Sequence, residues 1–117
     1  MNLLKPRKLI SEKLIQKKVE YLAKKISFDY KKAGINKVLV VGILKGSVIF
    51  LSDLVRKLTI TPEIDFIALS SYTGIKTTGV VRQLLDLRES PVGKDILIVE
   101  DIVDTGYTLK YLKENIL

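Results

Sequence analysis

Three carboxylates and two threonine hydroxyls cluster in residues 99–109, whose sequence is VEDIVDTGYTL. Adjacent carboxylates at Glu100 and Asp101 are suited to bind either sugar hydroxyls or a divalent cation held by the same ligand. A helix N-terminus offers backbone amides to a phosphate dianion, and threonine hydroxyls and a closely approaching glycine would complete the cradle. The residues that would form this cradle follow one another in the sequence: Asp104, Thr105, Gly106, Tyr107 and Thr108.

The neighbouring residues place this stretch between a strand and a helix. Residues 96–99 form a continuous apolar run bounded by charge, which is typical of a buried parallel strand. Leu109, Leu112 and Ile116 follow the turn at helical spacing. A generic strand-to-helix turn, in which Asp104 only caps the helix, is the alternative reading. The stretch as a whole favours a phosphate site over that alternative.

The rest of the chain predicts a single α/β domain over residues 1–117, with a parallel sheet and helices on both faces. Ligands in such sheets bind beyond the carboxyl ends of the strands. Ser11 predicts the start of the first helix and Gly34 its end. The expected elements are a helix over 12–32, a strand over 37–43, a helix over 48–57, a strand over 64–69 after Pro62, a polar mobile loop over 70–78, a return strand over 80–87 and a strand over 95–99.

Two further loops are expected at the same edge of the sheet. After the first strand, Lys45 supplies one fixed cation and Gly46 permits a tight backbone, a combination that suits a pyrophosphate group. Ser71 and Tyr72 begin the polar loop. The alternative readings are a surface lysine in an ordinary loop and a surface loop that contains a tyrosine by chance.

Composition excludes several kinds of chemistry. The chain has no cysteine and no histidine, so catalysis would depend on Asp, Glu, Lys, Tyr or a hard metal such as magnesium. No apolar run approaches membrane-spanning length, and the first ten residues are unlike a signal peptide. We therefore expect a cytoplasmic protein without a membrane partner.

The net charge of +7 belongs to the N-terminal segment. Residues 1–32 hold ten basic and three acidic side chains, whereas residues 33–117 hold ten of each. An apolar stripe at Ile15, Val19, Leu22 and Ile26 predicts the buried face of the helix. The lysines that lie largely off this stripe predict a solvated face, with an RNA-binding surface as the alternative, and they are Lys13, Lys17, Lys18, Lys24 and Lys25.

Residues 99–109 resemble the phosphoribosyl diphosphate (PRPP) binding motif of type I phosphoribosyltransferases, in which two acids precede a short phosphate loop. The aspartate that opens the loop, here Asp104, resembles the 6-oxopurine branch of that family. The resemblance implies the type I phosphoribosyltransferase core and transfer of 5-phosphoribosyl from PRPP to hypoxanthine or guanine, which would give IMP or GMP and pyrophosphate. Mg²⁺ is the implied cofactor.

The same resemblance implies roles for individual residues. Glu100 and Asp101 would hold the ribose hydroxyls directly or through the metal, and residues 104–108 would bind the 5′-phosphate. Asp104 is the candidate general base near the purine. Lys45 and Gly46 would contact pyrophosphate, and the peptide bond before the lysine can be cis in this family. Ser71 and Tyr72 would belong to a flexible loop that closes over the ligands and excludes water.

The resemblance covers the chain from about Ile10 onward, and the family pattern continues for roughly another third beyond residue 117. The purine-binding hood of the family belongs to that further part, so we expect these 117 residues to bind PRPP with magnesium weakly and to show little transferase activity. A homodimer or homotetramer is expected. The alternative is a non-catalytic RNA-binding regulator with the same fold. A dinucleotide-binding Rossmann domain is excluded, because no G-x-G-x-x-G turn follows the first strand.

Overall fold

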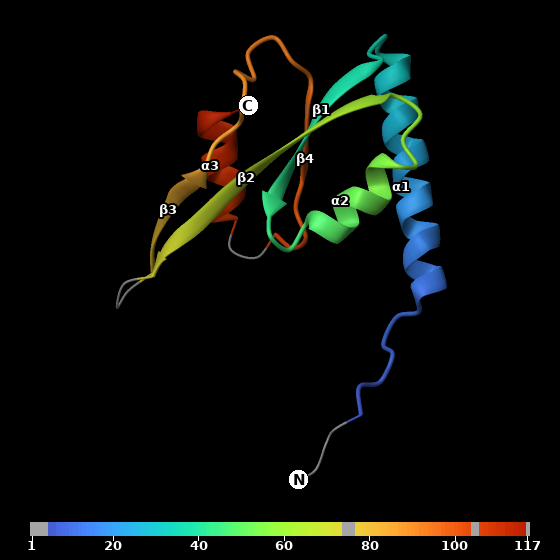
Figure 1. Ribbon diagram of the computed structural model, residues 1–117, viewed down its shortest axis with the longest axis horizontal. Coiled ribbons are helices and arrows are strands. Elements are labelled where there is room, and N and C mark those ends of the chain that lie inside the picture. Colours follow the sequence, from blue (N-terminus) through green and yellow to red (C-terminus); the bar gives the residue numbers. More distant parts are fainter. Residues whose placement is uncertain (1–4, 74–76, 104–105, 117) are drawn as a thin grey trace.

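A four-stranded sheet forms the centre of the protein, in the order β3-β2-β1-β4 (Figure 1). The computed structural model describes residues 5–73, 77–103 and 106–116. β1 is parallel to β2 and to β4, whereas β3 pairs antiparallel with β2. The elements are α1 (Glu12–Lys32), β1 (Lys37–Leu44), α2 (Val48–Val55), β2 (Thr61–Thr73), β3 (Thr77–Leu85), β4 (Ile96–Val99) and α3 (Tyr107–Asn115).

α1 begins and ends at the predicted residues. Ser11 caps it by accepting a hydrogen bond from the Leu14 amide at 3.1 Å, and Gly34 follows its end with φ of +78°. The predicted apolar stripe is only partly correct, because Ile15 and Leu22 stay 46% and 37% exposed. The buried residues of α1 are instead smaller ones, namely Val19, Ala23 and Ser27.

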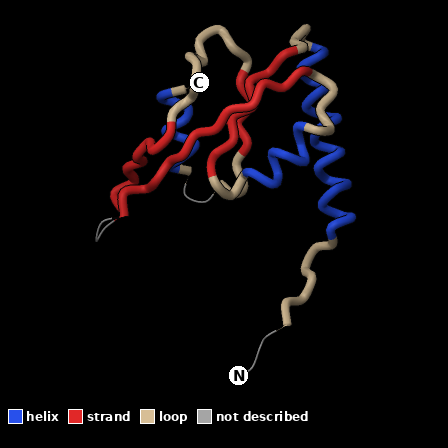
Figure 2. Tube along the Cα trace, in the orientation of Figure 1, coloured by secondary structure: helices blue, strands red, loops and turns tan. Residues whose placement is uncertain are grey.

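Helices cover both faces of the sheet, as the sequence predicts (Figure 2). Alternate residues of β1 point to opposite faces, so Val38 and Val40 pack with α1 and α2, whereas Leu39 and Val41 pack with Leu112 of α3. The sheet is therefore buried on both sides along β1. Within the described part of the chain, no helix is both long and apolar enough to cross a membrane.

The polar segment 70–78 was expected to be a mobile loop, and this expectation is wrong for most of it. Residues 70–73 continue β2 and residues 77 and 78 begin β3, while 74–76 lie outside the described residues. The reason is that threonine, serine and tyrosine are compatible with strands, and a two-stranded ribbon needs no continuous apolar face. β2 also begins earlier than expected, since Pro62 lies within it.

The remaining boundaries differ from the predicted ones by a few residues. α2 ends at Val55, two residues before the predicted end, and residues 56 and 57 form a turn. β3 covers 77–85 where 80–87 was expected, and β4 begins at Ile96, one residue late.

Candidate functional site

The site lies where β1 and β4 end together. The last pair between these parallel strands joins Gly42 to Val99. Beyond that pair, β1 leads into the loop at 44–47, and β4 leads into Glu100 and Asp101. Two segments that are 55 residues apart in sequence are therefore neighbours at the carboxyl edge of the sheet (Figure 1).

Gly46 and Asp101 are in direct contact across this edge. A Cβ atom built on Gly46 would lie 2.7 Å from Asp101 Cγ and would also overlap the carboxylate oxygens. Position 46 therefore has no room for a side chain while Asp101 keeps this conformation. The structure thereby joins two groups that the sequence predicted separately, namely the Lys45–Gly46 turn and the acidic pair.

The turn after β1 is compact. The peptide bond between Leu44 and Lys45 is cis, as the sequence resemblance implied. The Val48 amide donates to Lys45 O at 3.1 Å, which closes the turn at the start of α2. The Lys45 side chain is exposed. Ser47 is completely buried, and its hydroxyl donates to Ile43 O at 2.5 Å. Sequence reasoning assigned Ser47 no role, although a small hydroxyl residue before a helix is a recognisable signal.

The acidic pair concentrates negative charge at the strand end. Glu100 is half-buried, and its pKa is raised above the ordinary value, first by burial and then by the charge of Asp101. No ion pair involves either carboxylate among the described residues. A bound cation would relieve this repulsion, and carboxylate oxygens are ligands that Mg²⁺ prefers.

A metal at this position would need further ligands from elsewhere. No group of three or more Asp, Glu, His or Cys side chains is placed to hold a metal ion in the described part of the chain. Mg²⁺ usually keeps several waters and binds through one or two carboxylates plus oxygen atoms of a phosphorylated substrate. Glu100 and Asp101 together fit this pattern.

The turn after the acidic pair leads into α3. Gly106 has φ of +82°, in the left-handed region that favours glycine, and α3 begins at Tyr107. Lys110 N donates to Gly106 O at 2.9 Å, so the amides of Thr108 and Leu109 precede this helical hydrogen bond and lie at the positive end of the helix. This end of α3 is therefore suited to a phosphate group. The predicted Asp104 and Thr105 lie outside the described residues.

Ser71 and Tyr72 lie in the last part of β2, beyond the residues that pair with β1. The pairing of β1 with β2 ends at Leu44 and Ala68, so the β2–β3 ribbon continues past the edge where the site lies. The backbone of Ser71 and Tyr72 is thus beyond the end of β1, and their predicted role in ligand contact stays a prediction.

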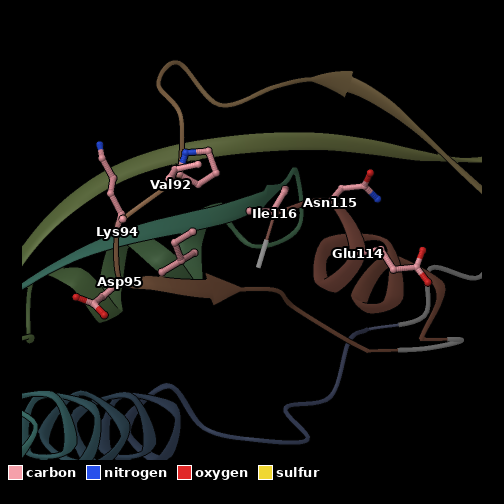
Figure 3. A pocket seen from close by; sticks show the side chains of 9 residues that line it. Val92, Lys94, Asp95, Glu114, Asn115 and Ile116 are labelled. Atoms are coloured by element: carbon pink, nitrogen blue, oxygen red, sulfur yellow. The ribbon is translucent and has the colours of Figure 1, made fainter.

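A cavity of about 660 Å³ lies at the opposite end of β4 (Figure 3). It lies between the segment that precedes β4 and the C-terminal end of α3, with Val92, Lys94 and Asp95 on one side and Glu114 and Ile116 on the other. This is the amino edge of the parallel strands, whereas ligands in such sheets bind beyond the carboxyl ends. None of the predicted site residues lines this cavity.

Comparison with known proteins gives consistent matches. The family model of the phosphoribosyl transferase domain matches residues 8–117. The chain is 46% identical over 111 residues to a hypoxanthine-guanine phosphoribosyltransferase of Dictyostelium discoideum, and 44% identical over 107 residues to a hypoxanthine phosphoribosyltransferase of Escherichia coli K12. Each match covers 91% of this chain, and the chain spans about 60% of the length of these relatives.

Solved structures agree with the sequence matches. A hypoxanthine-guanine phosphoribosyltransferase of Bacillus anthracis superposes with a TM-score of 0.84 at 40% identity, over 96% of this chain and 65% of that protein. The hypoxanthine phosphoribosyltransferase of Trypanosoma cruzi in complex with the product IMP gives a TM-score of 0.81 at 41% identity, over 93% and 65% of the two chains.

Proposed function

Because this chain belongs to the phosphoribosyltransferase family, we propose that it binds PRPP as part of a purine salvage enzyme. That enzyme would transfer 5-phosphoribosyl from PRPP to hypoxanthine or guanine, releasing pyrophosphate and forming IMP or GMP. The similarity to hypoxanthine and hypoxanthine-guanine phosphoribosyltransferases supports this substrate class.

The contact between Gly46 and Asp101 is the observation that carries the proposal. PRPP bears a pyrophosphate on one side of its ribose and a 5′-phosphate on the other. Binding it requires a pyrophosphate loop, groups for the ribose and a phosphate turn within one ligand length. The closeness of Gly46 and Asp101 supports assigning the first role to residues 45–46 and the second to Asp101, and the chain then leads to the start of α3, the proposed phosphate turn.

Each segment would then have one task. Lys45 and the tight backbone at Gly46 would bind the pyrophosphate. Glu100 and Asp101 would hold the ribose hydroxyls and Mg²⁺, which would neutralise the pyrophosphate as it leaves. The amides at the start of α3, with Thr105 and Thr108, would bind the 5′-phosphate. Asp104 would accept a proton near the purine ring, and Ser71 and Tyr72 would cover the ligands.

Titration calorimetry with PRPP tests this proposal. We expect the wild-type chain to bind PRPP in the presence of Mg²⁺, and Asp101→Ala to weaken that binding at least tenfold because a metal and ribose ligand is lost. Asp86→Ala is the matched control. This exposed aspartate follows β3, which is the outer strand on the opposite side of the sheet from β4. Absence of PRPP binding by the wild type, or equal binding by Asp101→Ala, would contradict the proposal.

We also propose that the protein self-associates as a dimer or tetramer. β4 is an edge strand of the sheet, and Ile102 and Val103 just beyond it are 72% and 59% exposed. Light scattering after size-exclusion chromatography measures the oligomer directly, and a monomer at high concentration would contradict this part.

A further inference from the structure

We propose that Ser47 is a positioning residue, whose buried hydroxyl holds Lys45 and Gly46 in the conformation that binds pyrophosphate. This inference rests on the proposed function, because it assumes that the turn after β1 is the pyrophosphate loop. It assigns a task to a residue that contacts no ligand itself.

The burial and bonding of Ser47 indicate a dedicated role. The side chain has no exposed surface, and its Oγ donates to Ile43 O at 2.5 Å. Serine before a helix usually accepts a hydrogen bond from an amide of the first turn, but Ser47 makes no such side-chain bond and has helical φ and ψ. Helix capping therefore does not account for the hydroxyl at this position.

The acceptor, Ile43 O, is a carbonyl group of β1 that lies beyond the residues paired with β4. Leu39 N donates to Asp95 O, so the backbone groups of Leu39 face β4. Backbone groups alternate sides along a strand, hence those of Ile43, four residues later, face the same side. The pairing with β4 ends at Gly42 and Val99. Ile43 O thus lies beyond the last pair, where Ser47 supplies the donor that β4 does not.

This bond fixes the turn from both of its ends. Ile43 and Ser47 flank residues 44–46, so their hydrogen bond closes a ring around the turn. The Val48 amide adds a second closure through Lys45 O at 3.1 Å, and the Leu51 amide anchors Ser47 O to α2 at 2.8 Å. Without the hydroxyl, Ile43 O would be a buried acceptor without this donor, and the turn would relax to satisfy it.

Two ligands separate a positioning role from a general structural one. Pyrophosphate with Mg²⁺ probes the turn after β1, whereas ribose 5-phosphate probes the phosphate turn at the start of α3. We expect Ser47→Ala to weaken pyrophosphate binding about tenfold, the size of one lost hydrogen bond, and to change ribose 5-phosphate binding less than about twofold. Calorimetry on the whole chain measures both.

Matched variants complete the test. Ser52→Ala removes a serine that accepts a hydrogen bond from Arg56 at the far end of α2, and it should leave both affinities unchanged. Ser47→Thr keeps the hydroxyl and should bind pyrophosphate more tightly than Ser47→Ala. Equal pyrophosphate binding by Ser47→Ala and wild type would overturn the inference, as would a parallel loss for both ligands.

The two proposals fail in different ways. If the wild type binds neither ligand, the proposed function fails and the role of Ser47 fails with it. If the wild type binds both ligands and Ser47→Ala does too, only the role of Ser47 is overturned.

Discussion

The two edges of the sheet both carry carboxylates, but their environments differ. At the amino edge, Glu63 lies 2.7 Å from Lys37 Nζ and 3.6 Å from Lys94 Nζ, and Lys94 lies 3.0 Å from Glu89. The hydrogen bond from Lys37 is the main reason why the pKa of Glu63 is lowered. Glu63 and Glu89 at this edge are thus paired with cations of the same chain.

At the carboxyl edge the shift has the opposite sign. Burial and the neighbouring Asp101 raise the pKa of Glu100, and no cation of the described residues pairs with either acid. At the amino edge, two acids therefore form ion pairs within the fold, whereas Glu100 and Asp101 at the carboxyl edge have no ion-pair partner among the described residues and are available to the proposed ligand.

The largest expected effect comes from Gly46→Ala, which would disrupt the contact between position 46 and Asp101 at the carboxyl edge. The new Cβ would occupy the place of the Asp101 carboxylate, so that side chain must rotate away from the ligand. Asp101 is exposed and can turn away at little cost to stability, but a carboxylate displaced from the ligand would lose its charge-assisted contacts, so we expect the affinity for PRPP with Mg²⁺ to fall about 10- to 100-fold. Titration calorimetry gives the value.

A double-mutant cycle provides the control for this prediction. In an Asp101→Ala background the clash is gone, so Gly46→Ala should cost much less affinity than it does in the wild type. Fully additive losses would show that the two positions act independently, contrary to the contact seen here.

A smaller effect is expected from Lys94→Met at the amino edge. It removes the ion pairs to Glu63 and Glu89 and should lower the melting temperature by about 2–3 °C at low salt, while PRPP affinity stays unchanged. The pKa of Lys94 is raised, so its stabilising contribution is present below the ordinary value of 10.5 and is lost as pH rises through the raised pKa.

Salt and acid sharpen that measurement. The difference in melting temperature between Lys94→Met and the wild type should shrink in 1 M salt, because the Debye length falls to about 3 Å and exposed ion pairs are then screened. It should also shrink as acid protonates Glu63, since a lowered pKa stabilises the fold only while the carboxylate is charged. A change in PRPP affinity would refute the separation of the two edges.

The smallest effect is expected from Glu100→Gln, and its measurement is the melting temperature at several pH values. Since the pKa of Glu100 is raised in the fold, the charged carboxylate costs stability, and this cost develops as pH rises above the ordinary 4.5. The variant should therefore melt about 1 °C higher at neutral pH and like the wild type in acid. A variant that melts lower than the wild type at neutral pH would contradict the conclusion that the charged Glu100 carboxylate costs stability.

Local signals made much of the fold predictable. Ser11 and Gly34 bound α1 because capping depends only on neighbouring residues. The apolar run 96–99 identified β4, and the spacing of Leu112 identified α3. The polar end of β2 was misjudged, because its pairing with β3 is tertiary and leaves no apolar alternation in the sequence.

The site was predictable in its parts but not in its assembly. The segments at 45–46 and 100–108 could be recognised from residue types, whereas the contact between Gly46 and Asp101 depends on the register of β1 and β4. The role proposed for Ser47 was hidden for the same reason, since the sequence does not show which residue of β1 is the last to pair with β4.

β2 combines two kinds of strand in one segment. Residues 61–67 pair with β1, Ala68 pairs with both β1 and β3, and residues 69–73 pair with β3. Each half of β2 therefore has its partner strand on one side, and the partner changes at Ala68. The β2–β3 ribbon beyond Ala68 therefore extends from the sheet without further pairing to β1, so the two halves of one strand belong to different pairs of strands.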